Sequence, residues 1–367
     1  MLVRSRLIAA LAAATLAATA CGADDGGASD PSGLVSEALT EVPAVVLDDA
    51  DDGIQLVVGD LVAAAEVAGL ERTPADDIAE AGDWLGALSG FGDAPIFVPS
   101  IELHEPEIAL LAGEDFVSEL GWSFARVERF VELSAPPARL TVVRGEGIAP
   151  ADGLDEVGGA LSVGAGADFE LDPDVRSFVR PLGRPLRLRA DDDAVVVSLS
   201  TAAALAWRSD EATLADDPLY ADAASSLDEV GVVAAMLFPG LARPVASVAT
   251  GVLDPDEAGE LLGAPAIDAP FLMTGLGWYA VDGDARARVV YVFTDADTAS
   301  AQVPLIEELV VSGVSLVSGE PIAELVTLDA IAADGQVVAL DVAFPAGRPP
   351  STVLSMYRSG EIIFLAG

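Results

Sequence analysis

The chain has 367 residues, of which 52% are hydrophobic, and a formal net charge of −42 at pH 7 from 60 acidic and 18 basic residues. This length leaves room for two domains with well-filled cores. A field this negative repels phosphate backbones and anionic lipid head groups, so nucleic acid is excluded as an expected partner.

The first residues have the pattern of a bacterial export signal. Arg4 and Arg6 precede the apolar run Leu7–Ala20, which is too short to span a bilayer as a permanent helix. Small residues then lead to Cys21, the only cysteine in the chain. We therefore expect residues 1–20 to be a signal peptide. Two alternatives stay open, a plain secretory signal and a non-cleaved membrane helix.

The junction Leu16-Ala17-Ala18-Thr19-Ala20-Cys21 resembles the lipobox of bacterial lipoproteins, although Ala18 stands where that family prefers leucine. The resemblance implies cleavage before Cys21, fatty acid attached through its thiol, and a lipid anchor on the extracytoplasmic face of the cell membrane. Two or three acyl chains would anchor the protein stably, since each buried methylene contributes roughly 0.8 kcal/mol. Residues 21–36 begin with small and polar side chains and are predicted to form a flexible tether after the lipidated cysteine.

Residues 37–137 are predicted to form a mixed, mainly helical region, from apolar runs beside turn residues and from apolar spacings of three and four. The predicted elements are a hairpin of Ala44–Asp49 and Ile54–Val58, helices over Gly59–Leu70 and Pro74–Leu88, a strand at Ile96–Val98, and helices over Glu114–Leu120 and Ser123–Leu133. Pro136 and Pro137 then close the last helix.

Residues 138–250 are predicted to form a first α+β unit. Its predicted elements are strand Leu140–Arg144, helix Gly153–Leu161, strand Asp168–Leu171, a hairpin of Leu186–Arg189 and Ala194–Ser198, helix Asp216–Val230 and strand Val232–Phe238. This order is typical of the split-βαβ or ferredoxin-like unit, in which helices cover one face of an antiparallel sheet.

Residues 251–367 repeat the pattern and are predicted to form a second α+β unit. The predicted elements are a hairpin of Phe271–Val281 and Arg286–Phe293, helix Asp297–Val311, a hairpin of Leu325–Ala332 and Val337–Phe344, helix Ser351–Tyr357 and strand Ile362–Leu365. We therefore expect an α+β fold with antiparallel sheets, helices on one face, and two ferredoxin-like units in tandem after a helical segment.

Three segments of the body are similar to secreted lipoproteins of high-GC, actinobacterial type. They are Glu119-Leu120-Gly121-Trp122-Ser123, Ala135-Pro136-Pro137 and Leu214-Ala215-Asp216-Asp217-Pro218. No chemistry is assigned to that group, so this resemblance implies no function.

The residue types exclude several chemistries. All 18 basic residues are arginine, which removes Schiff-base and phosphate-loop mechanisms that need lysine. His104 is the only histidine, and without a Gly-x-Ser-x-Gly elbow it predicts no serine triad; with Cys21 lipidated it cannot complete a zinc site either. The acidic run ending at Gly53 lacks calcium ligands at Ala50 and Gly59. We predict no catalytic, cofactor-binding or metal-binding residue, and lipidation at Cys21 as the one modified site.

The sequence favours a non-catalytic lipoprotein of the cell envelope that presents a binding or scaffolding surface outside the cytoplasmic membrane. Its expected partners are the membrane, through lipid on Cys21, and an envelope protein or a small-molecule ligand. Two alternatives stay open: a solute- or lipid-binding lipoprotein with a cleft between the two α+β units, and a hydrolase that uses paired carboxylates. The four tryptophans lie in apolar segments and are predicted to pack in the core.

Overall fold

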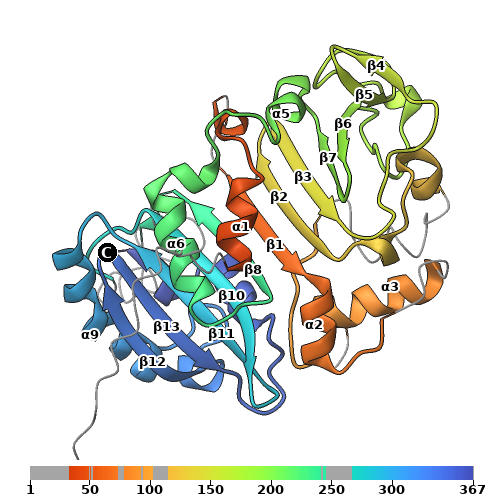
Figure 1. Cartoon of the computed structure of the whole chain (residues 1–367). Coiled ribbons are helices and arrows are strands. Elements are labelled where there is room, and N and C mark those ends of the chain that lie inside the picture. Colours follow the sequence, from red (N-terminus) through yellow and green to blue (C-terminus); the bar gives the residue numbers. More distant parts are fainter. Residues whose placement is uncertain are drawn as a thin grey trace, which may run out of the picture. The chain divides into compact units, whose positions relative to one another are not determined.

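The computed structural model describes residues 33–48, 50, 53–72, 78–91, 94–101, 115–240, 243–244 and 267–366. All of them belong to one compact unit, Ser32–Gly367, whereas the unit Met1–Pro31 lies outside the described residues. A 12-stranded sheet runs through the described unit (Figure 1), and all its strand pairs are antiparallel. This confirms a mixed α+β fold built on a large antiparallel sheet with several helices.

The strands follow the order β12-β13-β11-β10-β8-β1-β2-β3-β7-β6-β5-β4 across the sheet. Their bounds are β1 Gln55–Asp60, β2 Arg129–Ala135, β3 Ala138–Arg144, β4 Asp155–Val157, β5 Ala160–Val163, β6 Leu186–Asp191, β7 Ala194–Ser198, β8 Ala234–Pro239, β10 Met273–Val281, β11 Asp284–Val292, β12 Thr327–Asp334 and β13 Val337–Ala343. Two short strands, β9 (Arg243–Pro244) and β14 (Leu365–Ala366), pair in parallel as a separate sheet.

Two sets of five strands in this sheet share one topology. The order β1-β2-β3-β7-β6 recurs as β8-β10-β11-β13-β12. In the first set the second strand of the β6–β7 hairpin pairs with β3, and in the second set the second strand of the β12–β13 hairpin pairs with β11. The first strands of the two sets, β1 and β8, pair with each other from Leu56 opposite Leu237 to Gly59 opposite Ala234. Strands from all three predicted regions, 37–137, 138–250 and 251–367, therefore belong to one sheet.

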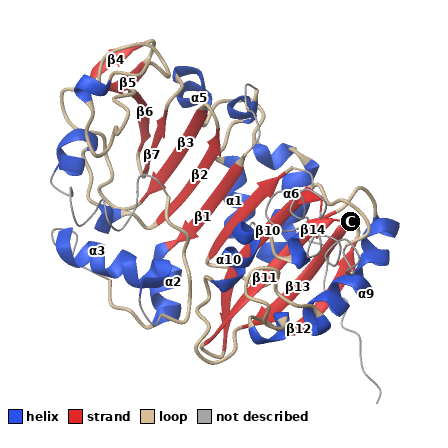
Figure 2. Ribbon diagram, turned by 180° about the vertical axis from the view of Figure 1, so that it is seen from behind, coloured by secondary structure: helices blue, strands red, loops and turns tan. Residues whose placement is uncertain are grey.

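Helices cover both faces of the sheet. Alternate residues of β1 enter different cores, Val57 on one side and Leu56 and Val58 on the other. The α9 face carries α2 (Leu61–Ala68), α3 (Ile78–Gly86), α9 (Ala296–Ser312) and α10 (Thr352–Ser359), and the α6 face carries α1 (Leu34–Thr40), α5 (Thr201–Ala206) and α6 (Pro218–Asp228) (Figures 1 and 2). The prediction of helices on one face is wrong, because the central strands are apolar on both sides and both sides must be buried.

Helix boundaries follow ordinary capping chemistry. The Asp60 carboxylate accepts a hydrogen bond from the Ala63 amide at 2.8 Å and starts α2, which ends where Gly69 adopts φ +65°. Asp217 caps α6, with Pro218 as its first residue, and Asp295 caps α9. Helix α1 begins at Leu34, inside the range 21–36 that was predicted as a tether.

The closing third matches its predicted elements well. Asp282 and Gly283 both have positive φ and form the two-residue turn of the β10–β11 hairpin, and the predicted β12–β13 hairpin is also present. Helix α9 continues through Pro304. Of the predicted strand Ile362–Leu365, most is a 3-10 helix, Ile362–Phe364, before the short strand β14.

Two predicted helices are strands. Ser123–Leu133 contains a 3-10 helix, Phe124–Arg126, and most of β2, whose residues are buried on both faces and so imitate a helical spacing of apolar residues. Gly153–Leu161 forms most of the β4–β5 hairpin, because Gly158 and Gly159 both take positive φ in its turn.

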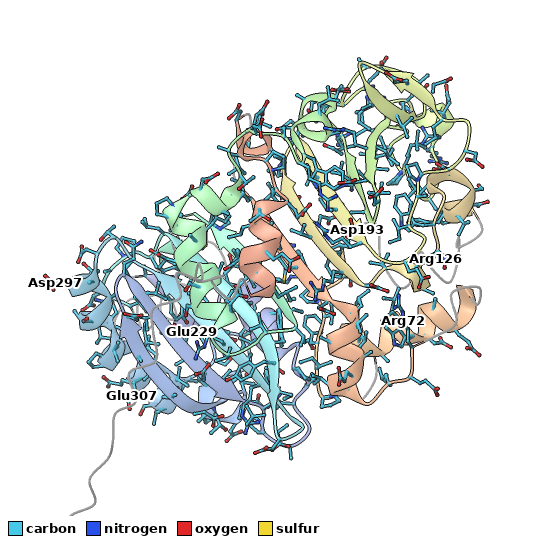
Figure 3. The ribbon with its side chains drawn as sticks, viewed as in Figure 1. Arg72, Arg126, Asp193, Glu229, Asp297 and Glu307 are labelled. Carbon is cyan, nitrogen blue, oxygen red and sulfur yellow. The ribbon has the colours of Figure 1, made fainter. Side chains whose placement is uncertain are left out.

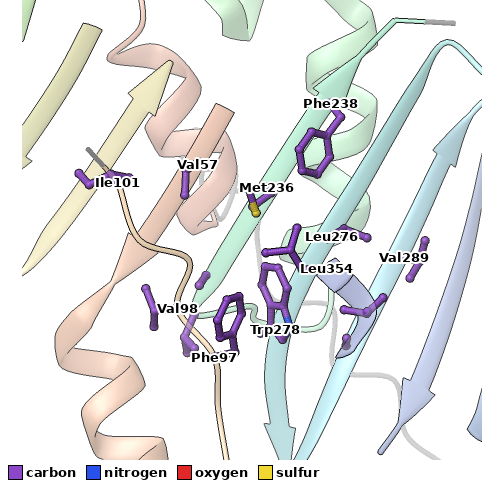
Figure 4. Packing of buried hydrophobic residues seen from close by; sticks show 14 of the residues in the cluster. Val57, Phe97, Val98, Ile101, Met236, Phe238, Leu276, Trp278, Val289 and Leu354 are labelled. Carbon is purple, nitrogen blue, oxygen red and sulfur yellow. The ribbon is translucent and has the colours of Figure 1, made fainter. Parts of the chain in front are cut away.

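Three predicted strands are absent from the described residues concerned. Ala44–Leu47 is a 3-10 helix, in which Val46 points into the core. Residues 96–98 pair with no strand and instead pack on the α9 face, where Phe97 meets Trp278 (Figure 4). Asp168 lies in a turn, where its carboxylate accepts a hydrogen bond from Arg187 Nε.

The predicted burial of the tryptophans is confirmed, since Trp84, Trp122, Trp207 and Trp278 all lie in the core. No helix within the described part of the chain is long and apolar enough to cross a bilayer.

Candidate functional site

The sequence-predicted positions of interest, Cys21 and His104, lie outside the described residues. Acidic side chains such as Asp193, Asp297 and Glu307 project from the surface (Figure 3). In the described ranges, no group of three or more histidine, cysteine, aspartate or glutamate side chains is arranged to hold a metal ion.

A pocket of about 510 Å³ lies where β2 turns into β3 through Pro136 and Pro137. Its apolar lining, Val179, Leu186 and Leu199, belongs to the core of the α9 face. This volume is within the range of small-molecule sites in proteins, roughly 300–1,000 Å³. We call it the arginine pocket, because Arg139, Arg180 and Arg184 line it and none of the described residues that line it is acidic.

The strand β3 places Arg139 in the pocket. Arg139 pairs across the hairpin with Ser134 of β2, and its backbone carbonyl accepts hydrogen bonds from the Ser198 hydroxyl at 2.8 Å and the Leu199 amide at 3.2 Å. The side chain is only 8% exposed. The guanidinium group of Arg139 is therefore held near the first residue of β3, largely out of contact with water.

A tight loop before β6 places Arg180 and Arg184. The Glu119 carboxylate accepts from Arg180 Nε at 3.3 Å and from the Ser177 hydroxyl at 3.0 Å. Gly183 takes φ +68° in this loop, and a Cβ there would lie 1.7 Å from the Asp172 carbonyl oxygen, so only glycine fits. The loop conformation is thus fixed by its own sequence.

Two of the guanidinium groups each contain one buried hydrogen-bond donor without an acceptor among the described residues. These donors are Arg180 Nη1 and Arg184 Nε. Buried donors are nearly always paired, because leaving one unpaired costs about 1–3 kcal/mol. Both guanidinium groups thus carry a donor that has lost water without gaining an acceptor in this part of the chain.

The positive charges of Arg139 and Arg184 repel each other. Burial, and after it the charge of Arg184, lowers the pKa of Arg139 to about 10. Both causes disfavour the charged form of Arg139, and an anion in the pocket would act in the opposite direction.

A local cluster of arginines in the sequence indicates this pocket, although the net charge of the whole chain is strongly negative. Residues 175–190 include five of the 18 arginines and no acid, in a chain with 60 acidic residues. Two of the five serve the fold: Arg187 is bonded to Asp168, and Arg189 donates to the carbonyl oxygens of Leu205 and Trp207. The contribution of Arg139, which lies outside the stretch, depends on tertiary structure.

No protein-family model, curated protein or solved structure matches the chain. The functional assignment therefore rests on the pocket itself. Its guanidinium groups can form charge-assisted, bidentate hydrogen bonds with a carboxylate, phosphate or sulfate. Ser134 is a hydroxyl among the lining residues, and no carboxylate or imidazole base is found among the lining residues that the structure describes.

Proposed function

We propose that the chain is a non-catalytic lipoprotein of the cell envelope that binds an anionic ligand outside the cytoplasmic membrane. The observation that supports this is the arginine pocket, in which Arg139, Arg180 and Arg184 gather and, among the described residues, no acidic side chain lines the wall, in a chain of net charge −42. Guanidinium groups gathered at one pocket are the donors that an anion site requires.

The site differs from the one that the solute-binding alternative expects. Its lining residues all fall between Ser134 and Leu199, so the pocket is not a cleft between the units 138–250 and 251–367. We keep the solute-binding function and assign it to the arginine pocket. The carboxylate-based hydrolase is less favoured, because the described lining of this pocket contains no pair of acids.

The lipid anchor at Cys21 belongs to the same proposal and is supported by the sequence pattern before that residue. We expect the mature protein to begin at Cys21 and to carry fatty acid, and we expect Cys21→Ala to be released from membranes. Intact-mass spectrometry of protein purified from its membrane fraction measures this. A free thiol, or a leader still attached, would contradict the anchor and leave the pocket proposal standing.

Binding should depend on Arg184. A hydrogen bond to a charged group contributes about 1.5–3 kcal/mol, so we expect Arg184→Ala to weaken binding of inorganic phosphate or sulfate by about tenfold to hundredfold. Isothermal titration calorimetry on the protein from residue 33 onward measures this. Arg176→Ala is the matched control, because Arg176 is an exposed arginine of the same segment that does not line the pocket.

The same variant separates a binding role from a structural one. A cation whose pKa is lowered by folding destabilises the fold below that pKa, and the charge of Arg184 contributes to the lowering at Arg139. In buffer without phosphate or sulfate, Arg184→Ala should therefore leave the free energy of unfolding unchanged or raise it. A clear loss of stability, or equal binding by Arg184→Ala and Arg176→Ala, would contradict the proposal.

The finer fold prediction, two ferredoxin-like units in tandem, also remains a proposal. A tandem organisation is supported by the recurrence of the strand order β1-β2-β3-β7-β6 as β8-β10-β11-β13-β12. The connection that comes nearest to a split βαβ unit is β11-α9-β12, in which a helix follows one hairpin and precedes the next.

A further inference from the structure

We infer, on the basis of the proposed function, that the ligand of the arginine pocket is an amphiphilic anion, with an acidic head group for the arginines and an alkyl chain for an apolar surface beside them. This names the chemical class that the pocket takes. It depends on three features of residues 171–186: exposed apolar side chains, apolar walls and a fixed loop.

Large apolar side chains are exposed along this segment. Leu171, Val175, Phe178 and Leu182 are 57%, 45%, 51% and 52% exposed, respectively. Leu182 lines the pocket, and Phe178 lies between the pocket residues Val179 and Arg180 and the 3-10 helix Pro173–Val175. Exposed apolar side chains in a segment that lines a pocket are typical of surfaces that a ligand covers.

The pocket itself continues this apolar surface inward. Val179, Leu186 and Leu199 line it and are buried, and proline rings at 136, 137 and 181 line it as well. A small inorganic anion would use the guanidinium groups and leave the exposed proline rings and Leu182 in contact with water. An alkyl chain attached to the anion would cover them, which is favourable in proportion to the apolar area removed from water.

Hydrogen bonds and a glycine turn fix the conformation of the loop at residues 177–183, so its apolar side chains Phe178 and Leu182 stay exposed. The amides of Ser177 and Gly183 both donate to the Arg180 carbonyl oxygen, at 3.1 and 2.8 Å. The left-handed conformation of Gly183 and its contact with the Asp172 carbonyl fix the return of the chain. Phe178 and Leu182 are therefore presented to solvent by a hydrogen-bonded turn that the same arginine organises.

The test compares inorganic phosphate with butyl, hexyl and octyl phosphate, each below its micelle concentration, by isothermal titration calorimetry on the protein from residue 33 onward. Burial of alkyl methylenes should raise the affinity by about tenfold or more from butyl to octyl phosphate. Arg184→Ala should weaken binding of every member of the series. The double variant Phe178→Ser/Leu182→Ser should remove most of the dependence on chain length and keep the affinity for inorganic phosphate.

Val317→Ser is the control for these substitutions, because Val317 is 67% exposed and does not line the pocket. A second arm incubates the protein with phosphatidylcholine vesicles that contain phosphatidic acid and then measures lipid retained after gel filtration. Retained phosphatidic acid, lost in Arg184→Ala, identifies a membrane lipid as the source; octyl phosphate binding without retained lipid identifies a soluble amphiphile. Both outcomes support the inference.

Other outcomes overturn it, and they separate the inference from the proposed function. Equal affinity for inorganic and octyl phosphate would refute the amphiphile and leave an anion site. A chain-length effect that is equal in Arg184→Ala would show an apolar surface without an anion site. Absence of binding by every member of the series would refute both.

Discussion

Replacement of Asp168 with alanine is expected to lower the free energy of unfolding by about 3–5 kcal/mol, because it leaves a buried cation without its counter-charge. Arg187 is only 1% exposed. Its Nε donates to Asp168 Oδ1 at 2.9 Å, and its other nitrogens donate to the Ser162 hydroxyl and the Gly166 carbonyl oxygen. Urea unfolding followed by circular dichroism measures the change.

The same carboxylate links three elements. Asp168 also accepts from the Thr201 amide at 2.6 Å and from its hydroxyl at 2.8 Å, at the first residue of α5. The bend at residues 164–168 is thereby tied to β6 and to α5. Loss of Asp168 should therefore loosen the start of α5 as well as expose the charge on Arg187.

A second substitution tests the cause. Arg187→Met added to Asp168→Ala removes the uncompensated charge and fills similar volume, so the double variant should recover most of the lost stability. Asp329→Ala is the matched control, since Asp329 pairs with Arg286 at 2.6 Å but is 40% exposed, and such pairs contribute about 0–1 kcal/mol. If Asp168→Ala costs no more than Asp329→Ala, the buried pair is not a stabilising element.

The hairpins of residues 251–367 could be predicted because the residues at each turn specify it without help from distant parts of the chain. The β10–β11 turn is Asp282-Gly283 and the β12–β13 turn is Gly335-Gln336, directly after Asp334, and both leave little choice of partner for the flanking strands. In the middle of the chain the signal is ambiguous. The turn at Gly158-Gly159 joins strands of three and four residues, and β2 is apolar on both sides, so spacing alone does not distinguish it from a helix.

The joining of the two strand sets could not be predicted. Strands β1 and β8 pair with Leu56 opposite Leu237. The residues of neither strand indicate which other strand will be its neighbour. Because β1 and β8 thereby become central strands, both sheet faces need cover, and this places helices on both. The pocket follows the same rule: the run of arginines at 176–189 is visible in the sequence, but its position beside Arg139 of β3 is a tertiary fact.

The second large effect is expected at Trp278, which is fully buried on the α9 face and joins three parts of the chain. It belongs to β10, its ring centre lies 5.0 Å from that of Phe97 in an edge-to-face arrangement (Figure 4), and its Nε1 donates to the Pro350 carbonyl oxygen at 2.9 Å. We expect Trp278→Ala to lower the free energy of unfolding by about 3–5 kcal/mol, measured by urea unfolding.

The hydrogen bond can be separated from the packing with phenylalanine. Trp122 is also buried and has an edge-to-face partner, Phe116 at 6.0 Å, but its Nε1 has no hydrogen-bond partner within the described ranges. Both Trp→Phe variants remove similar volume, whereas only Trp278→Phe leaves a buried carbonyl oxygen, that of Pro350, without its donor. Trp278→Phe should therefore cost about 1 kcal/mol more than Trp122→Phe. Equal losses would mean that Trp278 holds residues 94–101 and the Pro350 loop by packing alone.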